Sequence, residues 1–440
     1  MLVSVALPEH PWISDDPCEE IRGLAETAGA RIVGELTQKR QEIHLATYIG
    51  SGKVAELAQL VEATNADVVI FDNDLNPAQA RNLERATKVK VLDRSELILD
   101  IFATRAQTLE ARLQVELAQL EYSLPRLKNM WSHLSRQVGG GIGLRGPGET
   151  QLEVDRRLAS RRIADLKAKL ADVQARKERE VKSRQGEYTV SLVGYTNAGK
   201  SRLMNTLTHA GVGVENKLFS TLDTRTRQWQ IPEFGRVLLS DTVGFIRQLP
   251  HNLVASFKAT LEEARQARLL LHVVDASNPH AEQQIQAVVE VLKELEVDQK
   301  PTILVLNKID KIQDRSHLDV LQAHHPRSVA ISGLTGEGLA ELRDAVIQEL
   351  SQDFADAEVI TSAGNGKVIA YLNAHAEIYR QEYRDGELLI RCSLPRPLLR
   401  HVRVPGVKLT LLNSSKSVRS EEVGNGFSHL GFAGQVESAS

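Results

Sequence analysis

One short stretch of the sequence has residue types and a spacing suited to holding a polyphosphate. Residues 194–201, Gly-Tyr-Thr-Asn-Ala-Gly-Lys-Ser, match the pattern GxxxxGK[ST]. In this pattern the backbone N–H groups of a glycine-rich turn face phosphate oxygens at the start of a helix. We therefore expect Lys200 to reach the β- and γ-phosphates and Ser201 Oγ to ligate Mg²⁺. The expected strand 188–193 before the stretch and the expected helix 202–209 after it supply the context that a phosphate-binding loop requires.

Three further polar stretches follow in the order that a guanine-nucleotide site requires. After the expected strand 236–239, Asp241 can hold Mg²⁺ through water and Gly244 can meet the γ-phosphate. The carboxylate that ends the stretch 307–310, Asn-Lys-Ile-Asp, can accept two hydrogen bonds from guanine N1 and N2, which adenine cannot offer. The stretch 332–334, Ser-Gly-Leu, can present backbone N–H groups to guanine O6. Together the four stretches predict a guanine-nucleotide-binding domain.

The elements that must position these stretches suggest an α/β chain of several domains. We expect an N-terminal α/β domain at 1–104, a helical hairpin at 105–186, a nucleotide domain at 187–352, a C-terminal α+β module at 355–412 and a disordered tail at 413–440. The nucleotide domain should be a doubly wound, mostly parallel sheet that binds its ligand at the carboxyl ends of its strands. Its strands are expected near 188–193, 226–231, 236–240, 269–274, 302–306 and 328–331, and its helices begin near 199, 252, 281, 316 and 337.

The N-terminal 104 residues alternate between short apolar runs and helical patterns. Strands are expected at 3–7, 31–36, 43–49, 68–71 and 89–92, and helices at 18–27, 51–63 and 77–86. This order favours a mostly parallel sheet covered by helices. Asp72, Asp74 and Asp93 stand at strand ends, where we interpret them as turn formers and helix caps.

Leucines at helical spacing indicate that the next segment is an antiparallel helical hairpin. Leu109, Leu113, Leu117, Leu120 and Leu124 share one face, and Ile163, Leu166, Leu170 and Val173 repeat the pattern in the second arm. The second arm is basic, with nine Lys/Arg and four Asp/Glu at 161–184.

The tip between the arms is basic and rich in glycine. Between residues 123 and 148 it contains no acidic residue. Such a tip suits RNA phosphates and base stacking, although a flexible linker has a similar composition. The candidate RNA contacts are Arg126, Lys128, Trp131, Arg136 and Arg145. Residues 141–146 also fit the dinucleotide pattern GxGxxG, which we reject because no apolar strand precedes it and Pro147 follows.

The composition argues against a nucleic-acid-coating protein, a zinc site and a membrane-spanning segment. The net charge of −3 and the pI near 6.5 argue against a uniformly basic, nucleic-acid-coating protein, so no DNA partner is expected. Cys18 and Cys392 lie far apart and form no CxxC, which favours a reducing compartment and small buried packing residues over a zinc site. No apolar run is long enough for a membrane span, and residues 1–7 lack a basic signal region. We expect a cytoplasmic, monomeric protein.

With these residues in view, the sequence resembles the HflX family of ribosome-associated GTPases up to about residue 412. The resemblance rests on Gly139–Glu153, Gly194–Ser201, Phe219–Asp223 and Asp241–Phe245, of which the first is the most specific. It implies a GTPase that uses Mg²⁺, binds GTP and GDP, and associates with the large ribosomal subunit and its rRNA. It also implies a hairpin tip directed toward the peptidyl-transferase region and a role in splitting stalled or stress-arrested ribosomes.

The resemblance also assigns roles that the residues alone leave open. Thr221, Thr224 and Thr226 could each ligate Mg²⁺ from switch I, and the family motif selects Thr221. Two departures from the family pattern are Thr224, usually proline, and Arg202, usually threonine. The implied catalytic residues are Lys200, Thr221 and Gly244. The implied GTP-binding residues are Gly194, Tyr195, Thr196, Asn197, Ala198, Gly199, Lys200, Ser201, Phe219, Ser220, Thr221, Leu222, Asp223, Asp241, Thr242, Val243, Gly244, Asn307, Lys308, Ile309, Asp310, Ser332, Gly333 and Leu334.

Two hypotheses concern the mechanism. Phe245 stands where many small GTPases have a glutamine that orients the attacking water, which predicts slow intrinsic hydrolysis and stimulation by a partner. Asn197 stands where some GTPases help to hold K⁺. The alternatives are a GTPase of ribosome assembly or tRNA modification, and a GTP-dependent regulatory module with little turnover.

Overall fold

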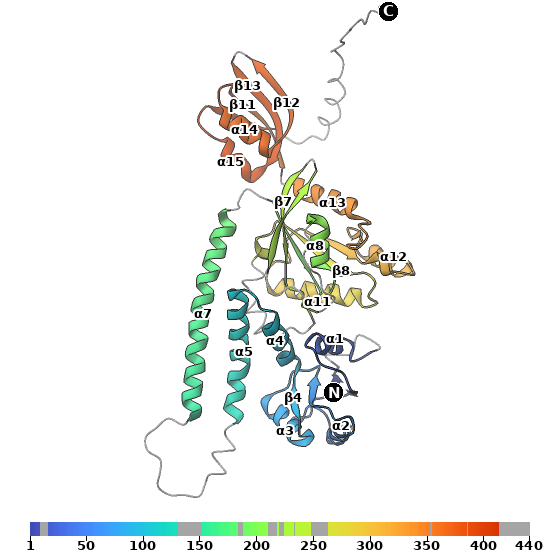
Figure 1. Cartoon of the computed structure of the whole chain (residues 1–440). Coiled ribbons are helices and arrows are strands. Elements are labelled where there is room, and N and C mark those ends of the chain that lie inside the picture. Colours follow the sequence, from blue (N-terminus) through green and yellow to red (C-terminus); the bar gives the residue numbers. More distant parts are fainter. Residues whose placement is uncertain are drawn as a thin grey trace, which may run out of the picture. The chain divides into compact units, whose positions relative to one another are not determined.

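The computed structural model describes residues 1–8, 16–130, 151–183, 188–209, 218–219, 224–232, 234–247, 263–352, 354–384 and 386–412. The chain divides into two compact units, Met1–Glu349 and Leu350–Ser440. Figure 1 shows the helices and strands of both, and each unit is described by itself.

The N-terminal part of the first unit is a parallel four-stranded sheet with helices. Its elements are β1 (Leu2–Ala6), α1 (Glu19–Thr27), β2 (Glu35–Lys39), α2 (Ser51–Thr64), β3 (Val68–Phe71), α3 (Pro77–Thr87), β4 (Lys90–Leu92) and α4 (Arg94–Arg105). The strand order is β2-β1-β3-β4, and every pair is parallel. The predicted α/β class is confirmed.

Two expected strands of this domain differ from the structure: the one expected at 31–36 is β2 at Glu35–Lys39, and the one expected at 43–49 is wrong. Residues 43–49 form a loop closed by a single bridge between His44 and Tyr48. The Leu45 side chain is 84% exposed, and Tyr48 has a φ of 65°, outside the strand region. An apolar run without a neighbouring strand gains no ladder hydrogen bonds and therefore stays a loop.

The predicted hairpin consists of α5 (Leu109–Met130) and α7 (Gln151–Ser183), which run side by side in opposite directions (Figure 1). Leu113, Leu117 and Leu166 form its buried core. Glu116 accepts hydrogen bonds from Arg162 Nε at 2.7 Å and Nη2 at 3.0 Å, across the two helices. Leu109 does not join the expected stripe, because its side chain is 72% exposed at the start of α5.

The nucleotide domain completes the first unit with a six-stranded sheet. Its elements are β5 (Tyr188–Gly194), α8 (Lys200–Thr208), β6 (Arg225–Ile231), β7 (Gly235–Asp241), β8 (Leu269–Asp275), α11 (Ala281–Glu294), β9 (Thr302–Asn307), η1 (Ile309–Lys311), α12 (Ser316–His324), β10 (Val329–Ala330) and α13 (Leu339–Ser351). The order β10-β9-β8-β5-β7-β6 places β5 inside the sheet, and only the β6–β7 pair is antiparallel. The phosphate-binding loop therefore leaves the carboxyl end of an interior strand, as predicted.

The second unit is an antiparallel sheet with helices. Its elements are β11 (Phe354–Ser362), α14 (Gly366–His375), β12 (Glu377–Arg384), β13 (Glu387–Pro395), η2 (Arg396–Leu398), α15 (Leu399–Val402) and β14 (Val407–Leu411). The order β12-β13-β11-β14, with the chain order β-α-β-β-α-β, is the ferredoxin-like arrangement. The predicted hairpin between β12 and β13 is confirmed, because Arg384 pairs with Glu387 and Gly386 has a φ of 82°.

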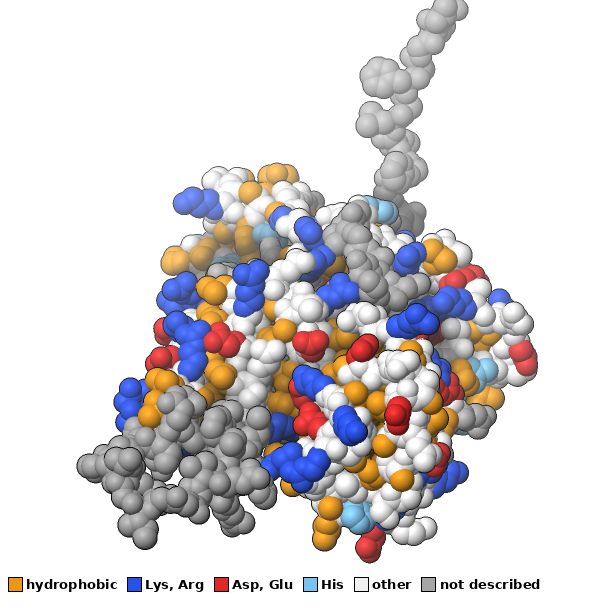
Figure 2. All heavy atoms as spheres, turned by 60° about the horizontal axis from the view of Figure 1, so that its bottom comes forward, with side chains coloured by type: hydrophobic (Ala, Val, Ile, Leu, Met, Phe, Trp, Pro, Cys, Tyr) orange, Lys and Arg blue, Asp and Glu red, His pale blue; other side chains and the backbone are white. Residues whose placement is uncertain are grey.

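The surface charges and the two cysteines are as the composition predicts. Lys and Arg side chains are interspersed with Asp and Glu on the face shown in Figure 2. Cys18 and Cys392 are free and buried, and burial raises the pKa of each thiol to about 12. Among the described helices, none combines the length and apolar character of a membrane span.

Candidate guanine-nucleotide site

The phosphate-binding loop, or P-loop (residues 194–201), depends on two glycines with positive φ angles. Gly194 has a φ of 148°, and a β carbon there would lie 2.1 Å from the carbonyl oxygen of Val273. Gly199 has a φ of 95° and begins α8. Because only glycine fits both places, the loop can curl over the end of β5 and direct its backbone amides toward an anion.

Lys200 lies at the bottom of this loop and is buried. Its ammonium group donates hydrogen bonds to the carbonyl oxygens of Gly194, at 3.0 Å, and of Tyr195, at 2.9 Å. Burial lowers the pKa of Lys200 to about 8, and the nearby Asp241 carboxylate opposes part of that shift. A polyphosphate would supply the negative charge that this buried cation lacks.

Two of the predicted magnesium ligands lie side by side. Ser201, in the first turn of α8, donates a hydrogen bond of 2.6 Å from Oγ to Oδ2 of Asp241, at the end of β7. Asp241 is fully buried. Oxygen atoms of a hydroxyl and a carboxylate are the ligands that Mg²⁺ takes, so the pair fits that ion. Thr221, the third predicted ligand, lies outside the described residues, as do Ser220, Leu222 and Asp223.

Gly244 packs directly on the P-loop. The backbone after it bridges to the loop, since Phe245 N donates to Gly194 O at 3.1 Å and Thr196 N donates to Phe245 O at 2.7 Å. A β carbon at position 244 would lie 2.7 Å from Thr196 Cα and 3.1 Å from Lys200 Nζ. This close approach requires glycine.

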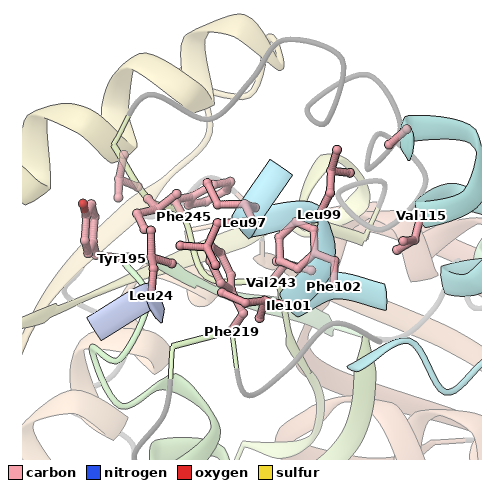
Figure 3. Packing of buried hydrophobic residues seen from close by; sticks show 14 of the residues in the cluster. Leu24, Leu97, Leu99, Ile101, Phe102, Val115, Tyr195, Phe219, Val243 and Phe245 are labelled. Carbon is pink, nitrogen blue, oxygen red and sulfur yellow. The ribbon is translucent and has the colours of Figure 1, made fainter. Parts of the chain in front are cut away.

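Phe245 is a core residue, which explains why no glutamine stands there. Its side chain is 3% exposed and belongs to a cluster that also contains Val243, Leu97 and Phe102 (Figure 3). A glutamine amide in this apolar cluster would have to bury its polar atoms among hydrocarbon side chains.

The predicted base-recognition residues lie close together after β9 and β10. Asn307 donates from Nδ2 to the carbonyl of Ala198 at 2.8 Å and accepts from the backbone N of Gly333 at 2.9 Å. Asp310 accepts a hydrogen bond of 2.6 Å from Ser332 Oγ. Asn307 thus ties the P-loop to the stretch 332–334, and the exposed carboxylate of Asp310 stands beside it.

Lys308 has a partner that the sequence did not indicate. Its ammonium group lies 2.6 Å from Asp275 Oδ2, at the end of β8. Lys308 also has a φ of 66°, so its backbone turns sharply between β9 and η1.

A buried polar network joins this site to the N-terminal domain. Tyr195 Oη donates to Glu20 Oε2 at 2.7 Å and accepts from Arg247 N at 3.0 Å. Arg94 pairs with Glu20, donates to Asp72 at 2.5 Å and donates to the carbonyl of Arg247 at 2.9 Å. Desolvation opposes the ionisation of Glu20, but Arg94 and Arg247 hold its pKa below the usual value.

Sequence reasoning missed this network. One available signal was Tyr195 itself, because a buried tyrosine hydroxyl usually needs a partner. The interpretation of Asp93 as a helix cap is confirmed, since it accepts a hydrogen bond of 2.8 Å from Glu96 N at the start of α4. Asp72 differs from this interpretation, because its carboxylate is paired with Arg94 rather than forming a turn.

Of the stretch 219–223, which is expected to form switch I, the structure describes Phe219. Its backbone N donates to Thr196 Oγ at 2.9 Å, and its side chain is 1% exposed. The ring meets Phe102 of α4 edge to face, with centroids 4.6 Å apart (Figure 3). The same apolar cluster thus contains residues of α4, Phe219 and the stretch after Asp241.

Of the candidate RNA contacts, Arg126 has an intramolecular role. Its guanidinium pairs with Asp93 at 2.5 Å and stacks on the Tyr122 ring, 3.5 Å from the centroid. It therefore joins α5 to the N-terminal sheet, and an RNA contact by Arg126 stays a prediction. The side chain of Lys128, and Trp131, Arg136 and Arg145, lie outside the described residues.

Comparison with known proteins decides the family. Three family models match in succession: "GTP-binding GTPase N-terminal" at 15–103, "GTP-binding GTPase Middle Region" at 105–184 and "50S ribosome-binding GTPase" at 189–308. GTPase HflX of Escherichia coli K12 is 48% identical over 383 residues, which cover 86% of this chain and 89% of that protein. The chain belongs to the HflX family of GTPases.

A second curated relative agrees with this assignment. GTPase HflX of Magnetococcus marinus is 46% identical over 385 residues, covering 86% of this chain and 88% of that protein. Among solved structures, a complex of SsGBP with GDP is 27% identical, covers 80% of this chain and 98% of that one, and has a TM-score of 0.46. Like its HflX relatives, the chain is a GTPase.

Proposed function

We propose that this HflX GTPase binds the large ribosomal subunit and uses its GTP-bound state to split stalled or stress-arrested ribosomes. The observation that carries the proposal is the match of residues 189–308 to a family of 50S ribosome-binding GTPases. The helical hairpin α5–α7 supplies the RNA-facing surface in this proposal, because Arg156 and Arg161 of α7 are exposed cations.

Within the site, each group has one role. The backbone amides of the P-loop and Lys200 hold the phosphates, while Asp310 and the stretch 332–334 recognise guanine. Ser201 and Thr221 ligate Mg²⁺, Asp241 holds it through water, and the ion neutralises charge on the β- and γ-phosphates. The potassium role of Asn197 stays a prediction. Equal GTPase rates in sodium and potassium buffers would remove it.

Slow intrinsic hydrolysis follows from the packing of Phe245. Its ring lies in the apolar cluster and offers no hydrogen bond to an attacking water. A ribosomal partner that orders the switch segments would raise the rate, and hydrolysis would then release those segments.

The contacts of the first unit offer a route from the hairpin to the switches. Arg126 of α5 binds Asp93, which caps α4. Phe102 of α4 then packs on Phe219 of switch I. A displacement of the hairpin would therefore shift switch I through α4. By the same contacts, γ-phosphate binding at switch I would shift the hairpin.

Light scattering from intact ribosomes tests the proposal. With a non-hydrolysable GTP analogue, the full chain should lower the scattering as subunits separate, whereas GDP should not support this. The double variant Arg156→Ala/Arg161→Ala should act more weakly than Arg396→Ala/Arg403→Ala, which removes two exposed arginines from the C-terminal unit. If the chain instead sediments only with assembly precursors or tRNA, the proposal is wrong.

A further inference from the structure

Arg247 lies close to the phosphate-binding loop, on the segment that lacks a water-orienting glutamine. The backbone of this segment is fixed against the loop at two points. Phe245 N donates to Gly194 O at 3.1 Å, and Arg247 N donates to the Tyr195 hydroxyl at 3.0 Å. Position 247 is therefore held beside the second residue of the P-loop.

The guanidinium of Arg247, which is partly exposed, is held loosely. Its Nε lies 3.7 Å from Glu20 Oε2, which is an ion-pair distance without a hydrogen bond. That Nε is buried and has no hydrogen-bond partner among the residues that the structure describes. An unmatched buried N–H costs free energy, so a position that satisfied it would be favoured.

The neighbouring Arg94 is more deeply buried and more firmly hydrogen-bonded than Arg247. Its side chain is 2% exposed, against 27% for Arg247, and it donates to Asp72 and to the carbonyl of Arg247. Both arginines face Glu20, but only Arg247 lines the adjoining cavity. Arg94 is therefore a structural cation of the interface, whereas Arg247 has space in which to move.

That cavity adjoins the P-loop. It measures about 220 Å³, and Tyr195, Thr196 and Asn197 line it together with Arg247 and Glu20. The amides of these loop residues are the groups that face the β- and γ-phosphates in the P-loop fold. The cavity thus gives the guanidinium space to move beside these loop residues.

We propose that Arg247 is a catalytic residue of GTP hydrolysis, an arginine finger supplied by this same chain. In the reaction, a water oxygen forms a bond to the γ-phosphorus while the bond to the β–γ bridging oxygen breaks. GDP leaves, and the proton of the water ends on the released phosphate. The guanidinium stabilises the negative charge that spreads over the transferred group and its leaving oxygen.

In this proposal Glu20 is a positioning residue, because it holds the guanidinium of Arg247. Its carboxylate and the γ-phosphate compete for one guanidinium, so contact with Glu20 keeps Arg247 withdrawn until GTP binds. The inference rests on GTP hydrolysis and not on ribosome binding, so either can fail without the other.

Single-turnover hydrolysis by the full chain, without ribosomes, tests the role. Arg247→Ala should bind GTP and GDP within about threefold of the unchanged protein, yet hydrolyse GTP about 10²-fold more slowly. Arg247→Lys should fall between the two, because it keeps the charge but not the planar donor set. Binding of GDP with aluminium fluoride, which imitates the transferred group, should be lost in Arg247→Ala.

Two controls separate catalysis from structure. Arg94→Met disrupts the same network without reaching the cavity, so it should lower the melting temperature but still capture GDP with aluminium fluoride. Arg236→Ala removes an exposed arginine of the same domain and should leave both readouts unchanged. The proposal is overturned if Arg247→Ala hydrolyses GTP at the normal rate, or if a folded Arg94→Met loses aluminium fluoride capture to the same extent.

Discussion

The rings of Phe102 and Phe219 meet edge to face, with centroids 4.6 Å apart and planes at 79°. Phe102 belongs to α4 of the N-terminal domain, and Phe219 is the first residue of the switch I motif. Both are essentially buried. The N-terminal domain thus contacts the segment that GTP is expected to reorganise.

Phe102→Ala should therefore affect both stability and nucleotide exchange. Removing a fully buried phenylalanine typically costs about 3–5 kcal/mol of unfolding free energy. Release of a fluorescent GDP analogue should also become faster, because switch I loses its apolar anchor. Stopped-flow fluorescence and urea unfolding measure the two effects.

Phe71→Ala is the matched control, because Phe71 is equally buried but packs in the other core of the N-terminal domain. It should lose comparable stability and leave GDP release unchanged. If both variants release GDP at the same altered rate, the contact with switch I has no specific role.

Nucleotide affinity should depend on pH through Lys200. Its pKa of about 8 in this structure must rise when a polyphosphate binds, because the negative charge favours the ammonium form. Above pH 8 the ammonium group must first gain a proton, so the affinity for GTP should fall as the pH rises. Below about pH 7 it should be flat.

Calorimetry in two buffers of different ionisation enthalpy detects that proton. Uptake should approach one proton per GTP near pH 9 and fall steeply as the pH is lowered from 8 to 7, because Lys200 is then already charged. An absence of uptake at pH 9 would show that Lys200 is already charged in the free protein. Lys200→Ala should abolish GTP binding altogether.

Base specificity should depend on Asp310. Asp310→Asn replaces an acceptor with a group that also donates, so the preference for guanine over other purines should weaken, by about 1–3 kcal/mol. Competition between GTP, XTP and ATP for the site measures this change. Asp314→Asn, four residues further on, alters an exposed turn carboxylate and should preserve the preference. An unchanged ranking in Asp310→Asn would contradict the assignment.

Gly244 should tolerate no side chain. A β carbon at this position would approach Thr196 Cα to 2.7 Å, so Gly244→Ala must push the segment away from the P-loop. GTP hydrolysis should fall at least about tenfold, which corresponds to about 1.4 kcal/mol. Gly52→Ala meets nothing within 4 Å and serves as the control in the same single-turnover assay. Equal rates in the two variants would refute the close-contact argument.

Much of the fold and of the site could be predicted from local sequence patterns. The apolar runs that became β5, β7, β9 and β10 each stand next to a polar motif, so strand and site support each other. The leucine spacing likewise predicted the hairpin, because Leu113, Leu117 and Leu166 do meet in its core. Periodicity and motif spacing are properties of short segments, so they can be recognised without knowledge of the tertiary contacts.

Contacts between distant segments could not be predicted in this way. Glu20 and Tyr195 are 175 positions apart, and no spacing rule pairs them. The helix α4 was not expected either, because its apolar residues are buried on several sides rather than along one stripe. Arg126 looked like a free cation in the sequence, since only the fold brings Asp93 to it.

The rate of GTP hydrolysis by the full chain in the presence of isolated ribosomal subunits tests the central claim most directly. Large subunits should raise the rate at least about tenfold over the chain alone, whereas small subunits should leave it unchanged. A chain that hydrolyses GTP rapidly by itself, at a rate indifferent to large subunits, would contradict the account.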